Sequence, residues 1–233
     1  MKSNREGNGK SHAKRVGAFF SKLTASSLDD FRVMEYPSPY SANVVLFTEG
    51  EPVRAVFVIL EGEVRLSINS SDGRRLSLRI ARKGDILGLS ESLSGFPYNM
   101  TAETLCASNI APIERSEFLD FLTRHPDAYH AVTEEMARQM AIACWQLRTL
   151  GLSSSAPEKL ARLLLEWRDQ DQATGHGSRL FSLTHEEIAG FIGTSRETVT
   201  RTLSKFKNRQ LVTFTGSMMT IPNRAALADY AHA

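Results

Sequence analysis

The hydrophobic pattern of this chain changes its period along the sequence. Between residues 44 and 113, apolar and polar residues alternate in four short runs, VVLF, AVFVIL, EVRLSI and RLSLRIA. Alternation of this kind is typical of strands that bury one face. Glycine-containing pairs punctuate the segment, and they are Glu49-Gly50, Glu61-Gly62, Asp72-Gly73 and Gly84-Asp85. Because Asp-Gly between two apolar runs favours a tight hairpin, the segment predicts a small antiparallel β-roll or barrel.

A helical period replaces the alternation after Arg115, and Pro126 begins one long amphipathic stretch that runs to Leu150. The spacing of its apolar stripe alternates between four and three: Tyr129, Thr133, Met136, Met140, Ala143, Leu147 and Leu150. Such a heptad seam predicts a coiled coil between two chains. A helix that lies on its own domain shows similar periodicity, but this stripe is narrow and the helix is longer than the small roll. We therefore favour a dimer seam.

A serine-rich break from Gly151 to Ala156 ends the long helix and predicts a hinge. Ser155 and Glu158 then have the spacing of a helix cap. The helix that they begin carries apolar residues for a second core, namely Leu160, Leu163, Leu164 and Trp167.

Two short helices joined by a tight turn follow. Thr184 and Glu187 form a capping box for the first helix, whose inward face carries Ile188, Phe191 and Ile192. Gly193 permits the sharp turn. Thr194 and Glu197 have the spacing of a second capping box. The buried stripe of the second helix is then Val199, Leu203 and Phe206.

The second helix gathers cations on its outer face. These are Arg196, Arg201, Lys205, Lys207 and Arg209, and the single acid among them is Glu197. A solvated basic helix would explain the charge alone. The two caps, the glycine turn and the spacing of Arg196, Glu197 and Arg201 instead favour a helix that enters the major groove of DNA.

The residues SRETVTR, from Ser195 to Arg201, resemble the recognition helix of the Crp/Fnr family of bacterial transcription regulators. Upstream, FTEGEPVRAVFVILEGEVRLS resembles the opening strands of the cyclic-nucleotide-binding fold, and GDILG resembles the lead into its ligand cassette. The resemblance implies an α+β protein with an N-terminal antiparallel β-roll, a long dimerisation helix and a C-terminal winged helix-turn-helix. The expected parts are a disordered basic tail (1–18), the effector-sensing roll (19–125), the dimerisation helix (126–150), a hinge (151–156) and the DNA-binding domain (157–233).

The same resemblance implies a homodimer on a palindromic DNA site, with RNA polymerase as a further partner. Residues 211–214 and 219–221, with Gly216 between them, supply the expected wing, and a final helix follows around residues 225–230. Because Arg196 resembles the cyclic-AMP-receptor branch, a TGTGA-like half-site is expected rather than a TTGAT-like one. The candidate DNA contacts are Thr184, Thr194, Ser195, Arg196, Glu197, Thr198, Thr200, Arg201 and Lys205.

The effector cassette departs from the family pattern. Cyclic-AMP-binding members carry G-E-L-G-L followed by R-S-A, where the glutamate contacts the ribose and the arginine pairs with the phosphate. Here Leu89 or Ser90 falls at the glutamate position, Glu91 is out of register and Met100 falls at the arginine position. An ordinary cyclic-AMP response is therefore not expected. An unidentified, uncharged effector would use Gly88, Leu89, Ser90, Glu91, Ser92, Asn99, Met100, Thr101, Ala143 and Cys144.

The last two of these, Ala143 and Cys144, stand where cyclic-AMP responders carry a Thr-Ser pair that contacts adenine. Cys144 beside the seam is more simply a small apolar residue than a redox thiol, since no cation cluster adjoins it. Two cysteines are too few for a four-cysteine iron-sulfur cluster, and no histidine lies between residues 44 and 113 to hold haem or a metal ion.

Composition adds the remaining limits. The 233 residues, 42% of them hydrophobic, can furnish two cores, and the net charge of +2 leaves the basic excess local to one helix. No apolar run is long enough for a bilayer or a leader, so we expect a cytoplasmic protein without membrane contact. No phosphate-cradling or metal-spacing motif predicts an enzyme. The alternative to a DNA-binding regulator is a ligand sensor that acts through protein contacts and retains a vestigial DNA domain.

Overall fold

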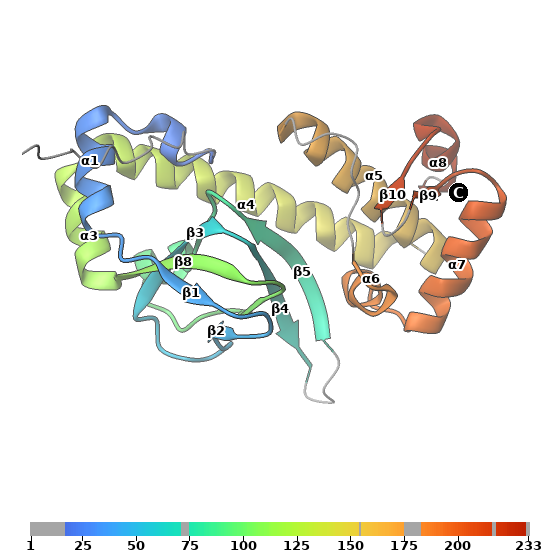
Figure 1. Ribbon diagram of the computed structural model, residues 1–233, viewed down its shortest axis with the longest axis horizontal. Helices are drawn as coiled ribbons and strands as arrows, with labels where there is room; N and C mark the ends of the chain where they lie inside the picture. Colours follow the sequence, from blue (N-terminus) through green and yellow to red (C-terminus); the bar gives the residue numbers. More distant parts are fainter. Residues whose placement is uncertain (1–16, 71–74, 154, 175–182, 216–217, 232–233) are drawn as a thin grey trace, which may run out of the picture.

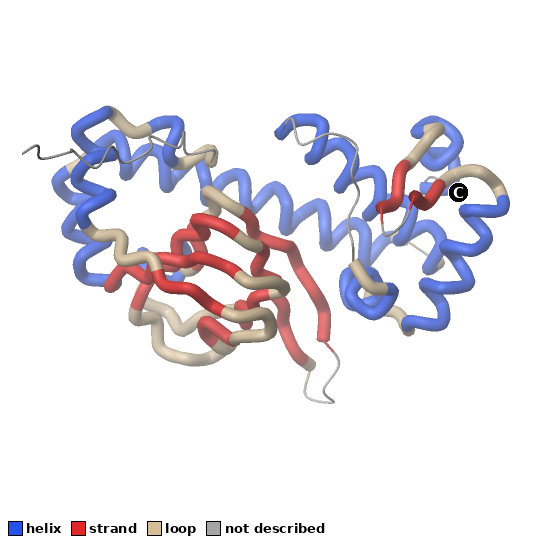
Figure 2. The backbone as a smooth tube through the Cα atoms, in the orientation of Figure 1, coloured by secondary structure: helices blue, strands red, loops and turns tan. Residues whose placement is uncertain are grey.

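The computed structural model describes residues 17–70, 75–153, 155–174, 183–215 and 218–231. It is an α+β structure with three parts in chain order (Figure 1): a β-roll with flanking helices, a long helix α4 that runs above it, and a C-terminal domain. Colouring by secondary structure shows that the strands gather in the roll and that the C-terminal domain is helical apart from one hairpin (Figure 2). The predicted fold class is confirmed.

The roll consists of two four-stranded antiparallel sheets that enclose a core between them. The first sheet has the order β1 (Ser38–Tyr40), β8 (Ser108–Glu114), β3 (Ala55–Glu61) and β6 (Ile86–Leu87). The second has the order β2 (Val45–Phe47), β7 (Thr101–Thr104), β4 (Glu63–Asn69) and β5 (Arg75–Arg82). Each of the four alternating runs of the sequence therefore contains a strand. The Asp72-Gly73 turn lies outside the described residues, although β4 and β5 do pair as a hairpin would.

A β-bulge interrupts the pairing of β4 with β5. Leu66 lies opposite Arg79 and Ser67 lies opposite Ser77, so Leu78 is an extra residue on β5. A bulge reorients the side chains around it relative to the regular alternation of a strand. Leu78 and Arg79 consequently line the same cavity, whereas Ile80 packs against the C-terminal domain.

Helices close the other side of the roll. A short 3-10 helix (Phe20–Lys22), α1 (Ala25–Val33) and α3 (Arg115–Arg124) surround the start of α4 (Pro126–Leu152), and α2 (Leu89–Ser94) lies at the end of β6. Phe31 packs edge-on against Phe20 and Phe121, with ring centroids 5.3 and 5.2 Å apart. This aromatic cluster joins residues from the beginning of the described chain to α3 and α4. Alternation and heptad spacing did not predict α1.

The long helix continues to Leu152, two residues beyond its predicted end, so the break before α5 (Ala156–Thr174) is shorter than the predicted hinge. The predicted cap of α5 is confirmed, because the backbone N–H of Glu158 donates to Ser155 Oγ at 3.3 Å. The C-terminal domain continues with α6 (His185–Ile192), α7 (Arg196–Asn208), β9 (Thr213–Thr215), β10 (Met218–Thr220) and α8 (Arg224–Ala231). The wing hairpin and the final helix lie where the sequence predicts them.

Candidate DNA-binding surface and effector cavity

The first helix of the pair, α6, begins as the sequence predicts. The backbone N–H of Thr184 donates to Glu187 Oε2 at 2.7 Å, and the N–H of Glu187 donates back to Thr184 Oγ1 at 3.2 Å. These two bonds satisfy N–H groups that the first turn of a helix leaves without partners. At its other end, α6 stops at Gly193, whose φ of 61° is the left-handed conformation that glycine tolerates best.

The second capping prediction was wrong by one residue. Ser195, not Thr194, is the N-cap of α7, and its hydroxyl accepts from the backbone N–H of Thr198 at 3.3 Å. The backbone N–H of Thr194 instead donates to Ala189 O at 3.1 Å and so closes the end of α6. The turn thus uses one more residue than a capping box at Thr194 would allow.

The two faces of α7 are separated as predicted. Val199, Leu203 and Phe206 are buried in the core of the C-terminal domain. The opposite face is exposed, and it presents Arg196, Glu197, Thr200, Arg201 and Lys205. Figure 1 shows α7 at the far end of the molecule from α1, beyond the end of α4, where a second macromolecule can reach it.

The acid on this face remains ionised at neutral pH. The pKa of Glu197 lies below its ordinary value because its own backbone N–H and the Ser195 hydroxyl donate to its carboxylate, and because Arg196 and Arg201 lie nearby. An ionised carboxylate only accepts hydrogen bonds, and cytosine offers its N4 amino group as a donor in the major groove. Glu197 thus has the protonation state that base recognition by a carboxylate requires.

Thr200, a predicted DNA contact, and Arg209, another cation predicted for this helix, already have partners within the protein. Thr200 Oγ1 donates to Arg196 O at 2.9 Å and lies 2.8 Å from His185 Nδ1, so it ties α7 to the start of α6. Sequence patterns did not single out His185, because a lone polar residue in a first turn carries no periodic signal. Arg209 lies over the ring of Tyr230 at 5.5 Å and bonds to its hydroxyl, which holds this cation against α8.

Comparison with known proteins agrees with this arrangement. Residues 37–125 match the model of the cyclic nucleotide-binding domain, and residues 158–230 match that of the Crp-like helix-turn-helix domain. The nitrogen fixation regulation protein FixK of Bradyrhizobium diazoefficiens is 30% identical, over 84% of this chain and 81% of that protein. The chain belongs to the Crp/Fnr family. It is therefore a DNA-binding transcription regulator and not an enzyme.

Another relative and a solved structure are also similar to this Crp/Fnr protein. The transcriptional activatory protein AadR of Rhodopseudomonas palustris is 29% identical, over 86% of this chain and 83% of that protein. The structure of FixK2 from Bradyrhizobium japonicum covers 85% of this chain and 98% of its own, with a TM-score of 0.75 and 24% identity. That structural likeness covers most of both chains, so it confirms the fold.

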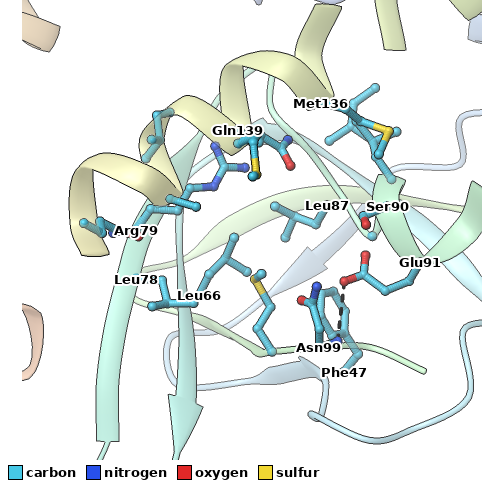
Figure 3. Close-up of a pocket in the computed structure, with 18 residues that line it drawn as sticks. Phe47, Leu66, Leu78, Arg79, Leu87, Ser90, Glu91, Asn99, Met136 and Gln139 are labelled. Carbon is cyan, nitrogen blue, oxygen red and sulfur yellow. Dashed lines mark hydrogen bonds between the residues drawn. The ribbon is translucent and has the colours of Figure 1, made fainter. Parts of the chain in front are cut away.

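A cavity of about 300 Å³ lies between the roll and α4 (Figure 3). Seven of the ten predicted effector residues line it, which are Gly88, Leu89, Ser90, Glu91, Asn99, Met100 and Ala143. The other three do not. Ser92 is fully buried within α2, Thr101 Oγ1 accepts from the backbone N–H of Glu49 at 3.1 Å, and Cys144 is exposed.

The rest of the lining comes from residues outside the predicted effector set, although Phe47, Leu66, Ile86 and Leu87 stand within the stretches that resemble the cyclic-nucleotide-binding fold. These residues are Phe47, Leu66, Leu78, Arg79, Ile86, Leu87, Met136, Gln139, Met140, Ile142 and Gln146. Figure 3 shows Met136 and Gln139 on α4 facing Leu87 and Leu66 across the cavity. These side chains meet only because α4 lies over the sheet. In the sequence, the one available signal for each of them was the hydrophobic period of its own helix or strand.

Most of the cavity wall is apolar, and its charged groups have partners. Arg79 Nη1 lies 3.7 Å from Asp85 Oδ2, and Glu91 Oε1 accepts from the backbone N–H of Asn99 at 3.4 Å (Figure 3). Among the described lining residues, Arg79 is the cation, and it extends from β5 rather than from the cassette. At the cassette position where cyclic-AMP responders carry arginine, the thioether of Met100 lines the wall. These residues do not fit the phosphate-binding pattern of a cyclic nucleotide.

The predicted seam follows the outer side of α4 only in part. Tyr129, Met140 and Leu147 are 53, 66 and 71% exposed. Met136 and Leu150, in contrast, are half-buried, and Met136 packs against the core beneath α1 and α3. The seam is therefore only partly accessible to a second chain.

Among the residues that the structure describes, no three His, Cys, Asp or Glu side chains are grouped closely enough to hold a metal ion. None of the helices in these parts of the chain combines the length and the apolar character that crossing a bilayer requires.

Proposed function

We propose that this Crp/Fnr regulator binds a twofold-symmetric DNA site as a parallel homodimer, and that it responds to an effector other than cyclic AMP. The observation that carries the proposal is the pairing of an exposed apolar stripe along α4 with an exposed, base-recognising face on α7 beyond its end. A parallel pair of α4 helices brings two such faces to the same end of the dimer.

The stripe on α4 supports the homodimer. Large apolar side chains in water are normal singly, but an aligned series along one helix is typical of an interface. Met140 and Leu147 are seven residues apart and point to the same side, and both are mostly exposed in the single chain. A second copy of the same helix would cover them with matching spacing.

The exposed side chains of α7 support a TGTGA-like half-site. Arginine binds guanine O6 and N7 with two hydrogen bonds, so Arg196 and Arg201 can each recognise a guanine, and Glu197 can accept from cytosine. All three side chains are exposed rather than folded into the domain. This exposure favours a working DNA reader over a vestigial domain that signals through protein contacts alone.

The cavity supports an effector that is mainly apolar. Apolar side chains from β4, β5, β6 and α4 form most of its wall, and its two charged side chains, Arg79 and Glu91, are engaged. A cyclic phosphate placed there would lose water without gaining an unpaired arginine. We also propose, from family membership, that the protein acts in the cytoplasm, with RNA polymerase as its partner at the promoter.

Binding-site selection on randomised duplex DNA, together with sedimentation of the free protein, tests this function. We expect enriched sequences with two inverted half-sites about one helical turn apart, and a dimer at micromolar concentration. The proposal would be contradicted if the selected DNA carried a single half-site and the free protein sedimented as a monomer.

A further inference from the structure

The DNA-binding domain does not hang freely from the hinge, because α6 packs directly on strand β5 of the roll. The contact is close at Gly190. A Cβ added to this glycine would lie 3.0 Å from Ser77 Oγ and 3.9 Å from the carbonyl oxygen of Arg75. At Gly193, an added Cβ would lie 3.9 Å from Leu76 Cδ1. Glycine at position 190 therefore lets the helix backbone approach the strand more closely than a residue with a side chain could.

An ion pair borders this contact. Arg65 Nη1 on β4 lies 3.8 Å from Glu187 Oε1 on α6, while its Nη2 donates to Glu103 Oε2 at 2.8 Å. The Arg65 side chain is only 12% exposed, so water screens its charge less than it would at the surface. The other carboxylate oxygen of Glu187 accepts the hydrogen bond that caps α6, and this bond orients the carboxylate toward Arg65. Ile80 adds an apolar contact, because it packs against the core of the DNA-binding domain.

The orientation of α6 fixes the orientation of α7. The two helices share a core that includes Ile188 and Val199, and the hydrogen bond between His185 and Thr200 joins their outer sides. The chain between α4 and α5 is only three residues long, and a short linker alone sets distance better than it sets angle. The α6–β5 contact supplies the angular restraint.

From these contacts we infer that Ser77 and Arg65 of the roll, with Gly190 and Glu187 of α6, are positioning residues for DNA binding. They hold the recognition helix at the angle that lets both subunits engage a symmetric site together. The inference rests on the proposed dimer function. When two heads bind one DNA molecule, the second binding step is intramolecular, and its effective concentration depends on geometry. A single half-site makes no such demand.

The test uses the full-length protein and two duplexes, one with the symmetric site selected above and one with a single half-site. In Gly190→Ala, the new methyl group presses against Ser77 Oγ. Alanine is a better helix former than glycine, so α6 itself is not weakened. We expect affinity for the symmetric duplex to fall about three- to tenfold and affinity for the half-site to stay within twofold of wild type.

A second substitution provides the rescue. Ser77→Ala removes the oxygen that the new methyl group meets, and the next atom is then Ser77 Cβ at 3.8 Å, an ordinary van der Waals separation. We expect Ser77→Ala alone to bind nearly as wild type and the double variant Gly190→Ala with Ser77→Ala to recover the symmetric-site affinity. A role of Gly190 in the internal packing of the DNA-binding domain alone would not respond to a change on β5.

The ion pair offers a matched comparison. Glu187→Gln keeps an oxygen for the cap of α6 but removes the charge that faces Arg65, so we expect a two- to threefold loss confined to the symmetric duplex. Arg75→Gln is the control, since Arg75 Nη1 donates to the same Glu103 carboxylate at 2.9 Å but does not bridge to α6. We expect this control to bind both duplexes as wild type.

The outcomes separate the two ideas. If Gly190→Ala binds the symmetric duplex as tightly as wild type or more tightly, or if its loss persists with Ser77→Ala, the positioning role is overturned. If the wild-type protein itself binds the half-site as well as the symmetric duplex, it is the proposed dimer function that fails.

Discussion

The carboxylate of Asp127, in the first turn of α4, accepts a 2.7 Å hydrogen bond from the backbone N–H of Thr24, which lies 103 residues earlier in the chain. Its other oxygen accepts from Ser27 Oγ at 2.8 Å. Burial opposes ionisation of this carboxyl, but the hydrogen bonds from Thr24 and Ser27 outweigh it and lower its pKa from 3.8 to about 2. The start of α1 is thus fixed to the start of α4 through one ionised group.

This bond predicts an acid-sensitive contribution to stability. Because the folded-state pKa is lower than the unfolded one, the contribution is complete above pH 3.8 and is lost as the pH falls toward 2. We expect Asp127→Asn to lower the free energy of unfolding by about 1 to 2 kcal/mol at pH 7, and to differ less from wild type at pH 3. Urea unfolding at both pH values measures it. Asp29→Asn, which alters an exposed pair with Arg32, is the control. A deficit that is the same at both pH values would contradict the prediction.

The apolar stripe on α4 predicts which substitutions separate the subunits. Leu147→Glu would place two like charges in the seam, where they lose water without a partner, so we expect dimer affinity to fall at least tenfold, or about 1.4 kcal/mol. Ala141→Glu adds the same charge at an exposed position on another side of α4 and should leave the dimer intact. Sedimentation equilibrium of both variants, with circular dichroism to verify folding, decides between them. Equal dissociation by the two would argue against this seam.

The lining of the cavity predicts indifference to cyclic AMP. A ligand at a hundredfold its dissociation constant stabilises the folded state by about 2.7 kcal/mol, which a thermal unfolding curve detects readily. We expect no shift in the unfolding midpoint at millimolar cyclic AMP, and no change in affinity for the selected DNA. The selected duplex itself, which should raise the midpoint, serves as the positive control. A clear stabilisation by the nucleotide would mean that Arg79 or another group replaces the arginine missing at Met100.

The two kinds of cation on α7 should respond differently to removal. We expect Arg196→Ala to cost about 1 to 3 kcal/mol and to relax the base preference at one position in each half-site. If Lys205 contacts only phosphate, Lys205→Ala should weaken binding to all DNA sequences alike. It should also reduce the slope of log affinity against log salt concentration by about one. Site selection with each variant, followed by titration at several salt concentrations, distinguishes them. An unchanged preference for Arg196→Ala would make that residue a phosphate contact and remove the basis for the TGTGA-like assignment.

Local signals in the sequence were sufficient for most elements of this protein. The four alternating runs became strands, and the Thr184 cap, the Gly193 turn and the buried stripe of α7 are confirmed, because each depends on residues within one turn or strand. Ser195 rather than Thr194 caps α7, because the backbone N–H of Thr194 donates to the end of α6. The ends of the two helices thus compete for the same residue. The hydroxyls at Ser195 and Thr194 look equivalent in sequence.

The cavity was only half predictable for a related reason. The cassette residues adjoin one another in the chain, and most of them line the wall. Leu78, Arg79 and Gln139 join them only because β5 bulges and α4 crosses the sheet, and neither event leaves a motif. The tight contact of Gly190 with Ser77 was equally hidden, since a glycine inside an amphipathic helix gives no indication of what its missing side chain admits.

The bulge at Leu78 has a consequence for how any effector would be sensed. On one side of β5, Leu78 and Arg79 form part of the cavity wall, and on the other, Ser77 and Ile80 touch the DNA-binding domain. A molecule that enters the cavity would therefore contact β5 on one face, while the DNA-binding domain contacts the opposite face of the same strand. Only the backbone of β5 separates the cavity from the DNA-binding domain. An effector in the cavity could therefore affect that domain without a chain of intermediate residues. Loss of a residue of β5 other than the extra Leu78 would shift part of the strand by one position against β4, and side chains that now face the cavity would then face the DNA-binding domain.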